Sequence, residues 1–209
     1  MERLLEYEAY FGQKESVIFD LDDTLYKEWD YLREAYKAIS LDVENQFAIN
    51  HEEVFSFLRD EFHERGRHLL FNRMIYDFGI PETYLTRAIV ILRTVHFPEK
   101  IPCFAKIVEL IKRLEEDKKG LFIVTNGNIE QQRNKIAHID FGPFMKNMHV
   151  VYADEFAPKP SPAVFNYLQE KFMVSPRYTV MIGDSPTDES FAKACEMEFI
   201  CVQTILSSL

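Results

Sequence analysis

The sequence has little cysteine, no long apolar run and no excess of positive charge, and each absence excludes a class of protein. Its three cysteines lack the paired spacing of metal sites, and two lie in apolar surroundings typical of reduced thiols. No apolar run approaches the roughly 18 to 20 residues that a membrane-spanning helix needs. The charged, amphipathic N-terminus lacks a signal-peptide core, so we expect a cytoplasmic protein without membrane partners.

The net charge of -10 opposes general binding to nucleic acid or to an anionic membrane. An anionic ligand would therefore need a local positive site or a bound cation. The fractions of hydrophobic residues (47%) and charged residues (28%) are close to those of ordinary globular domains, and no low-complexity segment interrupts the chain. A chain of 209 residues suits one domain, or one domain that carries an insertion.

Short continuous apolar runs are typical of buried parallel strands, and the chain has five of them, at residues 17–19, 121–124, 150–152, 180–182 and 199–202. Helical patterns at 129–139, 163–172 and 187–195 separate the later runs and are long enough to cross back over a sheet. We expect Ser161 to cap the second of these helices, with Pro162 at its first position. The order predicts an α/β fold, a Rossmann-like doubly wound parallel sheet.

Residues 27–100 show helical spacing of apolar residues and no convincing strand. Breaks near residues 50–51, 66 and 79–81 divide this segment into about four helices. We therefore predict a core domain formed by 1–26 and 101–209, with an all-helical domain, 27–100, inserted after the first strand. Tyr26 and Trp29 lie near the expected hinge, where they either contact a ring or sugar of a ligand or pack internally.

Polar side chains follow the first four predicted strands. In an open parallel sheet, ligands bind beyond the carboxyl ends of the strands. The residues at these ends are Asp20 and Asp22, then Thr125 and Asn126, then Lys159, and finally Asp184 and Asp188. Each group alone could be an ordinary turn or helix cap, but the four in this order favour a functional site.

These residue types indicate a metal and phosphoryl site. An extended chain would place Asp20 and Asp22 on one side, about 6.6 Å apart, so that one could attack while the other moves a proton. Crowded carboxylates resist ionisation unless a divalent cation neutralises them, and oxygen ligands suit Mg²⁺. Lys159 supplies a positive charge, and the Thr125 hydroxyl with the following backbone N–H groups supplies donors for phosphoryl oxygens.

With these residues the sequence resembles the haloacid dehalogenase superfamily of hydrolases. The four motifs of that family occur in order, as DLDDT at residues 20–24, Thr125, Lys159 and GDSPTD at residues 183–188. The resemblance covers nearly the whole chain. It extends to the subgroup in which an α-helical cap domain is inserted after the first motif, which makes 27–100 the cap.

The resemblance implies a mechanism. Asp20 would attack phosphorus to give an aspartyl-phosphate, and Asp22 would protonate the leaving alcohol and then activate water. Mg²⁺ would be held by the Asp20 carboxylate, the Asp22 backbone carbonyl and the Asp184 carboxylate, with Asp188 in a supporting position. Lys159 would bind Asp20 and the phosphoryl group. Thr125 and the Asn126 backbone would bind the transferring oxygens.

The resemblance also bears on which activity of the superfamily this chain is expected to have. Members that cleave carbon–halogen bonds lack an aspartate at the position of Asp22, so we do not expect dehalogenation. A phosphomutase of a sugar phosphate, or a non-catalytic binding or scaffold protein on the same fold, remains open. We expect a Mg²⁺-dependent phosphatase of a small-molecule phosphate ester, with nucleoside monophosphates and sugar phosphates as the leading substrates.

Overall fold

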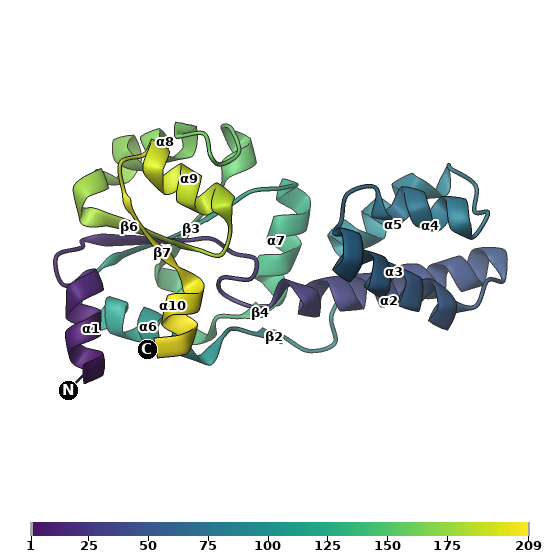
Figure 1. Cartoon of the computed structure of the whole chain (residues 1–209), viewed down its shortest axis with the longest axis horizontal. Coiled ribbons are helices and arrows are strands. Elements are labelled where there is room, and N and C mark those ends of the chain that lie inside the picture. The colour runs from purple at the N-terminus through teal and green to yellow at the C-terminus, as the bar shows by residue number, and fades with distance from the viewer. Residues whose placement is uncertain (1, 209) are drawn as a thin grey trace. The chain divides into compact units, whose positions relative to one another are not determined.

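The computed structural model describes residues 2–208. The chain forms two compact units, whose elements are labelled in Figure 1. The first, which we call the core unit, comprises the chain up to Lys27, Ile101–Gln132 and the chain from Ile139 onward. The second, the helical unit, comprises Glu28–Lys100 and Arg133–His138. Helix α7 (Ile129–His138) is therefore divided between the two units.

A parallel sheet of five strands forms the centre of the described part of the core unit. In spatial order the strands are β5 (Met148–Tyr152), β3 (Gly120–Thr125), β1 (Ser16–Phe19), β6 (Thr179–Gly183) and β7 (Glu198–Cys201). All five predicted strands are confirmed. The last one ends at Cys201, one residue earlier than predicted, because Val202 begins helix α10 (Val202–Ser208).

Strand β1 is central and is buried on both faces, since Val17, Ile18 and Phe19 have no exposed surface. Burial of each such side chain contributes about 1.5–3 kcal/mol to folding. Figure 1 shows helices α8 (Ala163–Phe172) and α9 (Pro186–Ala194) over one face of the sheet. Over the other face it shows α1 (Glu2–Phe11), α6 (Ala105–Glu116) and α10. The sheet is thus covered on both sides, as a doubly wound α/β fold requires.

The described part of the core unit also contains short elements. Strands β2 (Ile101–Pro102) and β4 (Ile139–Asp140) pair in parallel, and three 3₁₀ turns are η1 (Gly142–Asn147), η2 (Ala153–Glu155) and η3 (Pro176–Tyr178). Strands of two residues are too short to show a periodic pattern, so the sequence did not predict them.

Helix α8 spans the predicted residues 163–172, but its cap lies one residue later than predicted. The carbonyl of Pro162 accepts the first helical hydrogen bond, from Asn166 N at 3.0 Å, so Pro162 occupies the N-cap position. Ser161 precedes the cap, and its Oγ accepts a bond from Ala163 N at 3.3 Å.

The helical unit contains α2 (Glu28–Phe47), α3 (His51–Arg65), α4 (Leu70–Asp77) and α5 (Tyr84–Thr94), which confirms the four predicted helices and their breaks. Asn50 caps α3, because its Oδ1 accepts bonds from the backbone of Glu52 and Glu53 at 2.8 and 3.2 Å. Among the residues that the structure describes, no helix combines the length and apolar character needed to cross a membrane.

The helical unit also contains a buried ion pair between distant parts of the sequence. Lys135 Nζ, on the last part of α7, lies 2.9 Å from Glu28 Oε1, and the two side chains are 1% and 3% exposed. Next to it, Asn134 donates to Tyr31 Oη at 3.1 Å and to the carbonyl of Val95 at 2.9 Å. The end of α7 is therefore tied to α2 and to the chain after α5 by polar contacts that are costly to break.

Candidate active site

Asp20 lies directly beyond the end of the central strand. Its backbone N–H donates to the carbonyl of Ile182 in β6 at 2.9 Å, so the residue is fixed between β1 and its neighbour. Its side chain is 12% exposed. The chain then turns: Leu25 N donates to Leu21 O at 3.0 Å, and Asp22 lies in this turn. The extended chain that the sequence predicted through Asp22 therefore ends at Phe19, and a turn follows it.

Lys159 joins two carboxylates that come from different elements. Its Nζ donates to Asp20 Oδ1 and to Asp188 Oδ1, each at 2.6 Å, and its own side chain is 2% exposed. Burial alone lowers the pKa of Lys159, but the two carboxylates outweigh burial and raise it above its ordinary value. The lysine is therefore a permanent positive charge at the end of the sheet.

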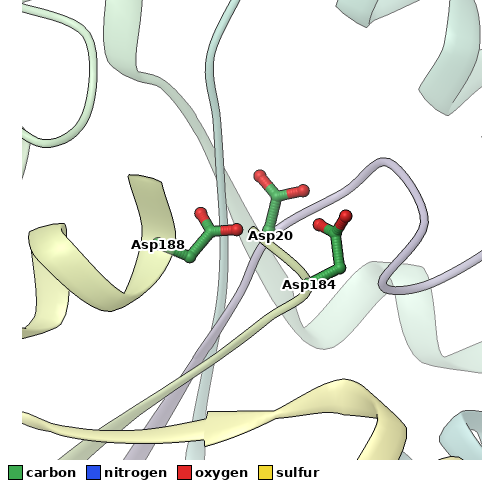
Figure 2. Close-up of side chains that lie close together, drawn as sticks. All are labelled: Asp20, Asp184 and Asp188. Atoms are coloured by element: carbon green, nitrogen blue, oxygen red, sulfur yellow. The ribbon is translucent and has the colours of Figure 1, made fainter. Parts of the chain in front are cut away.

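Asp20, Asp184 and Asp188 converge at this end of the sheet. Each offers a carboxylate oxygen within 4.8 Å of the others. Figure 2 shows Asp20 between the other two, with the three carboxyl groups pointing to the same side. Burial, together with repulsion from Asp188 and Asp22, raises the pKa of Asp20 to about 7 in spite of Lys159. Burial and the charges of Asp188 and Asp23 raise the pKa of Asp184 to about 6.

Asp188 has both of its oxygens engaged by the chain. While Oδ1 accepts from Lys159, Oδ2 accepts from Ser185 Oγ at 2.7 Å and from Ser185 N at 3.2 Å. Ser185 Oγ in turn accepts from Asp188 N, which completes a capping box at the start of α9. Asp188 is 1% exposed. Its position suits a residue that holds Lys159 and the loop before α9 in place.

Gly183 leaves the room that Asp188 occupies. A Cβ atom on Gly183 would lie 2.5 Å from Asp188 Cβ and 2.6 Å from its Cγ. We expect Gly183→Ala to reduce the free energy of unfolding by about 1–3 kcal/mol, because the overlap displaces a side chain that cannot rotate away. Urea denaturation measures this loss. In a double-mutant cycle, Asp188→Gly, which removes the Cβ atom as well as the carboxyl group, should cost less in the Gly183→Ala background than in the native protein, whereas additive losses would contradict the clash.

The strand end at Thr125 is tied to the loop that carries Lys159. Asn126 Nδ2 donates to the carbonyl of Lys159 at 2.9 Å, and Lys159 N donates back to Asn126 Oδ1 at 2.8 Å. The side chain of Asn126 thus sets the backbone of Lys159. Thr125 is 1% exposed. Its Oγ1 accepts a bond from Gln132 Nε2 at 2.6 Å.

Two side chains near Asp22 were not assigned to the site from the sequence. Tyr26 Oη donates to Asp22 Oδ1 at 2.6 Å, and Gln132 Nε2 lies 3.3 Å from Asp22 Oδ2. From the sequence, Tyr26 could either contact a ligand or pack internally. Gln132 belongs to none of the four motifs. It lies at the start of the second turn of α7, the helix that follows Thr125. Because side chains of a helix tilt toward its N-terminus, a polar residue there was a detectable candidate.

The family model for haloacid dehalogenase-like hydrolases matches residues 17–202. No curated protein matches the chain significantly in sequence.

Solved structures share the fold at low sequence identity. YfnB from Bacillus subtilis, described as bound to magnesium, is 22% identical, with a TM-score of 0.63 over 89% of this chain and 85% of that one. CbbY from Rhodobacter sphaeroides, in complex with xylulose-(1,5)bisphosphate, is 18% identical, with a TM-score of 0.60 over 90% and 85%. A haloacid dehalogenase phosphatase from Thermococcus onnurineus is 22% identical, with a TM-score of 0.55 over 88% and 84%. The match to the family model spans most of the sequence, and the chain therefore belongs to the haloacid dehalogenase-like hydrolases.

Proposed function

We propose that this hydrolase is a Mg²⁺-dependent phosphatase of a small phosphorylated metabolite, such as a nucleoside monophosphate or a sugar phosphate. The observation that carries the proposal is the position of Asp20. It follows the central strand, accepts a bond from the buried Lys159, and lies within 4.8 Å of two further carboxylates. The phosphatase and the sugar-bisphosphate complex among the similar structures support a phosphate ester as substrate.

The carboxylate cluster suits a divalent cation. Three carboxyl groups with oxygens within 4.8 Å of one another offer hard ligands. Burial and the neighbouring carboxylates raise the pKa of Asp20, so its charged form favours an added positive charge. Asp20 and Asp184, with the backbone carbonyl of Asp22, would hold Mg²⁺, and Asp188 would support them through Lys159 and Ser185. When bound, Mg²⁺ supplies positive charge that stabilises the negatively charged phosphoryl group.

The residues of the chain then perform two displacements at phosphorus. An oxygen of Asp20 bonds to phosphorus while the bond to the leaving oxygen breaks, and Asp22 gives that oxygen its proton. Asp22 next removes a proton from water, whose oxygen displaces Asp20 and releases inorganic phosphate. Lys159 and Thr125 hold the phosphoryl oxygens in both steps.

The test is release of inorganic phosphate from a panel of phosphate monoesters, with Mg²⁺ and with a chelator. We expect release that requires the metal, and the ranking of esters gives the substrate class. Two other outcomes contradict the proposal. Activation by a sugar bisphosphate with little release of phosphate indicates a mutase. No turnover of any ester by the folded protein with Mg²⁺ indicates a scaffold.

Proton release should accompany binding of the cation. The pKa values of Asp20 and Asp184 lie above the ordinary carboxyl value, so the cation displaces protons and binds more tightly as the pH rises. Without a cation, a rise in pH has the opposite effect on the folded protein. Between about pH 4 and 7 the folded state holds more protons than the unfolded state, so its stability falls as the pH rises.

We therefore expect saturating Mg²⁺ to raise the unfolding temperature more at about pH 8 than at about pH 6. At a concentration about 100-fold above Kd the gain corresponds to about 2.7 kcal/mol. Thermal unfolding at both pH values, with MgCl₂ or with a chelator, measures it. An equal gain at the two pH values would show that Asp20 and Asp184 do not bind the cation.

A further inference from the structure

Asp22 is held by donors from two distant parts of the chain. Tyr26 donates to one carboxylate oxygen at 2.6 Å, and Gln132, which lies 110 positions further along, reaches the other at 3.3 Å. Because a donor faces each oxygen, the two contacts restrain the orientation of the carboxyl group.

Tyr26 is itself immobilised within the core unit. Its residue is fully buried, and it forms isolated β-bridges with Asp22 and with Cys103. The neighbouring backbone is fixed as well, since Phe104 N donates to the carbonyl of Leu25 at 2.9 Å. The hydroxyl of Tyr26 is therefore presented to Asp22 from a rigid support.

Gln132 links Asp22 to the strand end at Thr125. Its amide nitrogen lies 2.6 Å from Thr125 Oγ1 and 2.8 Å from the carbonyl of Asn126, in addition to Asp22 Oδ2. Gln132 is 2% exposed. The carbonyl and the carboxylate only accept hydrogen bonds, which identifies the nitrogen as the atom that faces them. The buried amide of Gln132 thus contacts both Asp22, which would act on the leaving group, and Thr125, which would bind the phosphoryl oxygens.

The bond to Thr125 also directs the hydroxyl hydrogen. Since Thr125 Oγ1 accepts from Gln132, its own hydrogen points elsewhere, and its intramolecular acceptor, the carbonyl of Asn126, lies at a long 3.4 Å. That hydrogen is available to a phosphoryl oxygen.

We propose that Tyr26 and Gln132 are positioning residues: Tyr26 orients Asp22 for proton transfer, and Gln132 orients both Asp22 and the Thr125 hydroxyl. This inference rests on the proposed phosphatase function. It predicts different kinetic effects for the two residues, because Tyr26 donates to the proton-transfer group, whereas Gln132 contacts both that group and the phosphoryl-binding group.

The experiment compares Tyr26→Phe and Gln132→Met with the native protein, using 4-nitrophenyl phosphate and an alkyl phosphate in the presence of Mg²⁺. Each change removes the donor and keeps the size of the side chain. Gln131→Met is the matched control, since it alters the adjacent glutamine on the same helix. We measure kcat, KM, the pre-steady-state release of nitrophenolate, and competitive inhibition by inorganic phosphate.

We expect Tyr26→Phe to lower kcat for the alkyl ester by about 10-fold or more without changing KM, since a positioned acid contributes about 10²–10⁴-fold. The burst of nitrophenolate should keep the native rate in Tyr26→Phe, because this leaving group needs no proton. The steady-state turnover that follows should be slower, since Asp22 must then activate water. Gln132→Met should lower kcat as well and weaken inhibition by inorganic phosphate. Native kinetics for Gln131→Met are expected.

The failures are distinguishable. If the native protein turns over and both variants match it, the positioning roles are wrong. They are also wrong if both variants lose all rates with both esters equally, since that is the effect of a general structural fault. If the native protein releases no phosphate from either ester, the phosphatase function fails and this inference fails with it.

Discussion

Asp20→Asn is expected to reduce phosphate release by at least about 10⁴-fold, because the amide of asparagine cannot form the aspartyl-phosphate and loss of a nucleophile removes most of the acceleration. The fold should persist. An asparagine oxygen can still accept the bond from Lys159 that Asp20 accepts at 2.6 Å. Phosphate release and trapping of a phosphorylated protein measure the effect.

The same substitution should not lower stability when no cation is present. The pKa of Asp20 is raised to about 7, so above that pH its negative charge opposes folding, and neutral asparagine removes this cost. We expect the unfolding temperature of Asp20→Asn at about pH 8, with a chelator, to equal or exceed that of the native protein.

The control for the loss of turnover is Glu189→Gln, which removes an exposed charge next to Asp188 in the sequence and should turn over normally. Turnover by Asp20→Asn within tenfold of native would show that Asp20 is not the nucleophile.

Lys159→Met is expected to cost about 3–5 kcal/mol of unfolding free energy at neutral pH, because it removes the buried cation between two carboxylates. Lys159 bonds Asp20 and Asp188 at 2.6 Å each, and all three side chains are at most 12% exposed. Typical domains are stable by only about 5–15 kcal/mol, so the variant should unfold at much lower urea concentrations.

The loss should depend on pH. Lys159 lowers the pKa of Asp20, so without it that pKa rises further above the ordinary carboxyl value. The folded variant then keeps its proton to higher pH, and the deficit should be smaller at about pH 5 than at about pH 8. Lys193→Met, at an exposed position of α9, should change stability by less than about 0.5 kcal/mol. A deficit equal at both pH values would show that Asp20 does not depend on this lysine.

Much of the fold could be predicted because burial leaves a clear pattern in the sequence. The run at Val17–Phe19 is apolar at every position since both faces of its strand are covered, and the breaks between the four helices of the helical unit follow turn residues. The strand-end residues were found because the carboxyl ends of parallel strands meet at one edge. What remained hidden depends on contacts between residues that lie far apart in the sequence and on turns that follow no simple pattern. Gln132 contacts Asp22 across 110 positions, and the turn after Phe19 replaces the extended chain that was expected.

The division of α7 has a consequence for protein engineering. The helical unit is not a contiguous insertion, because Arg133–His138 belongs to it while the first part of the same helix, with Gln132, belongs to the core unit. A chimera that exchanges only Glu28–Lys100 with a relative would leave Lys135 without its native partner Glu28. Asn134 would likewise lose its native partners Tyr31 and Val95. Exchange of the whole helical unit therefore requires two grafts, and the second begins at Arg133, directly after Gln132.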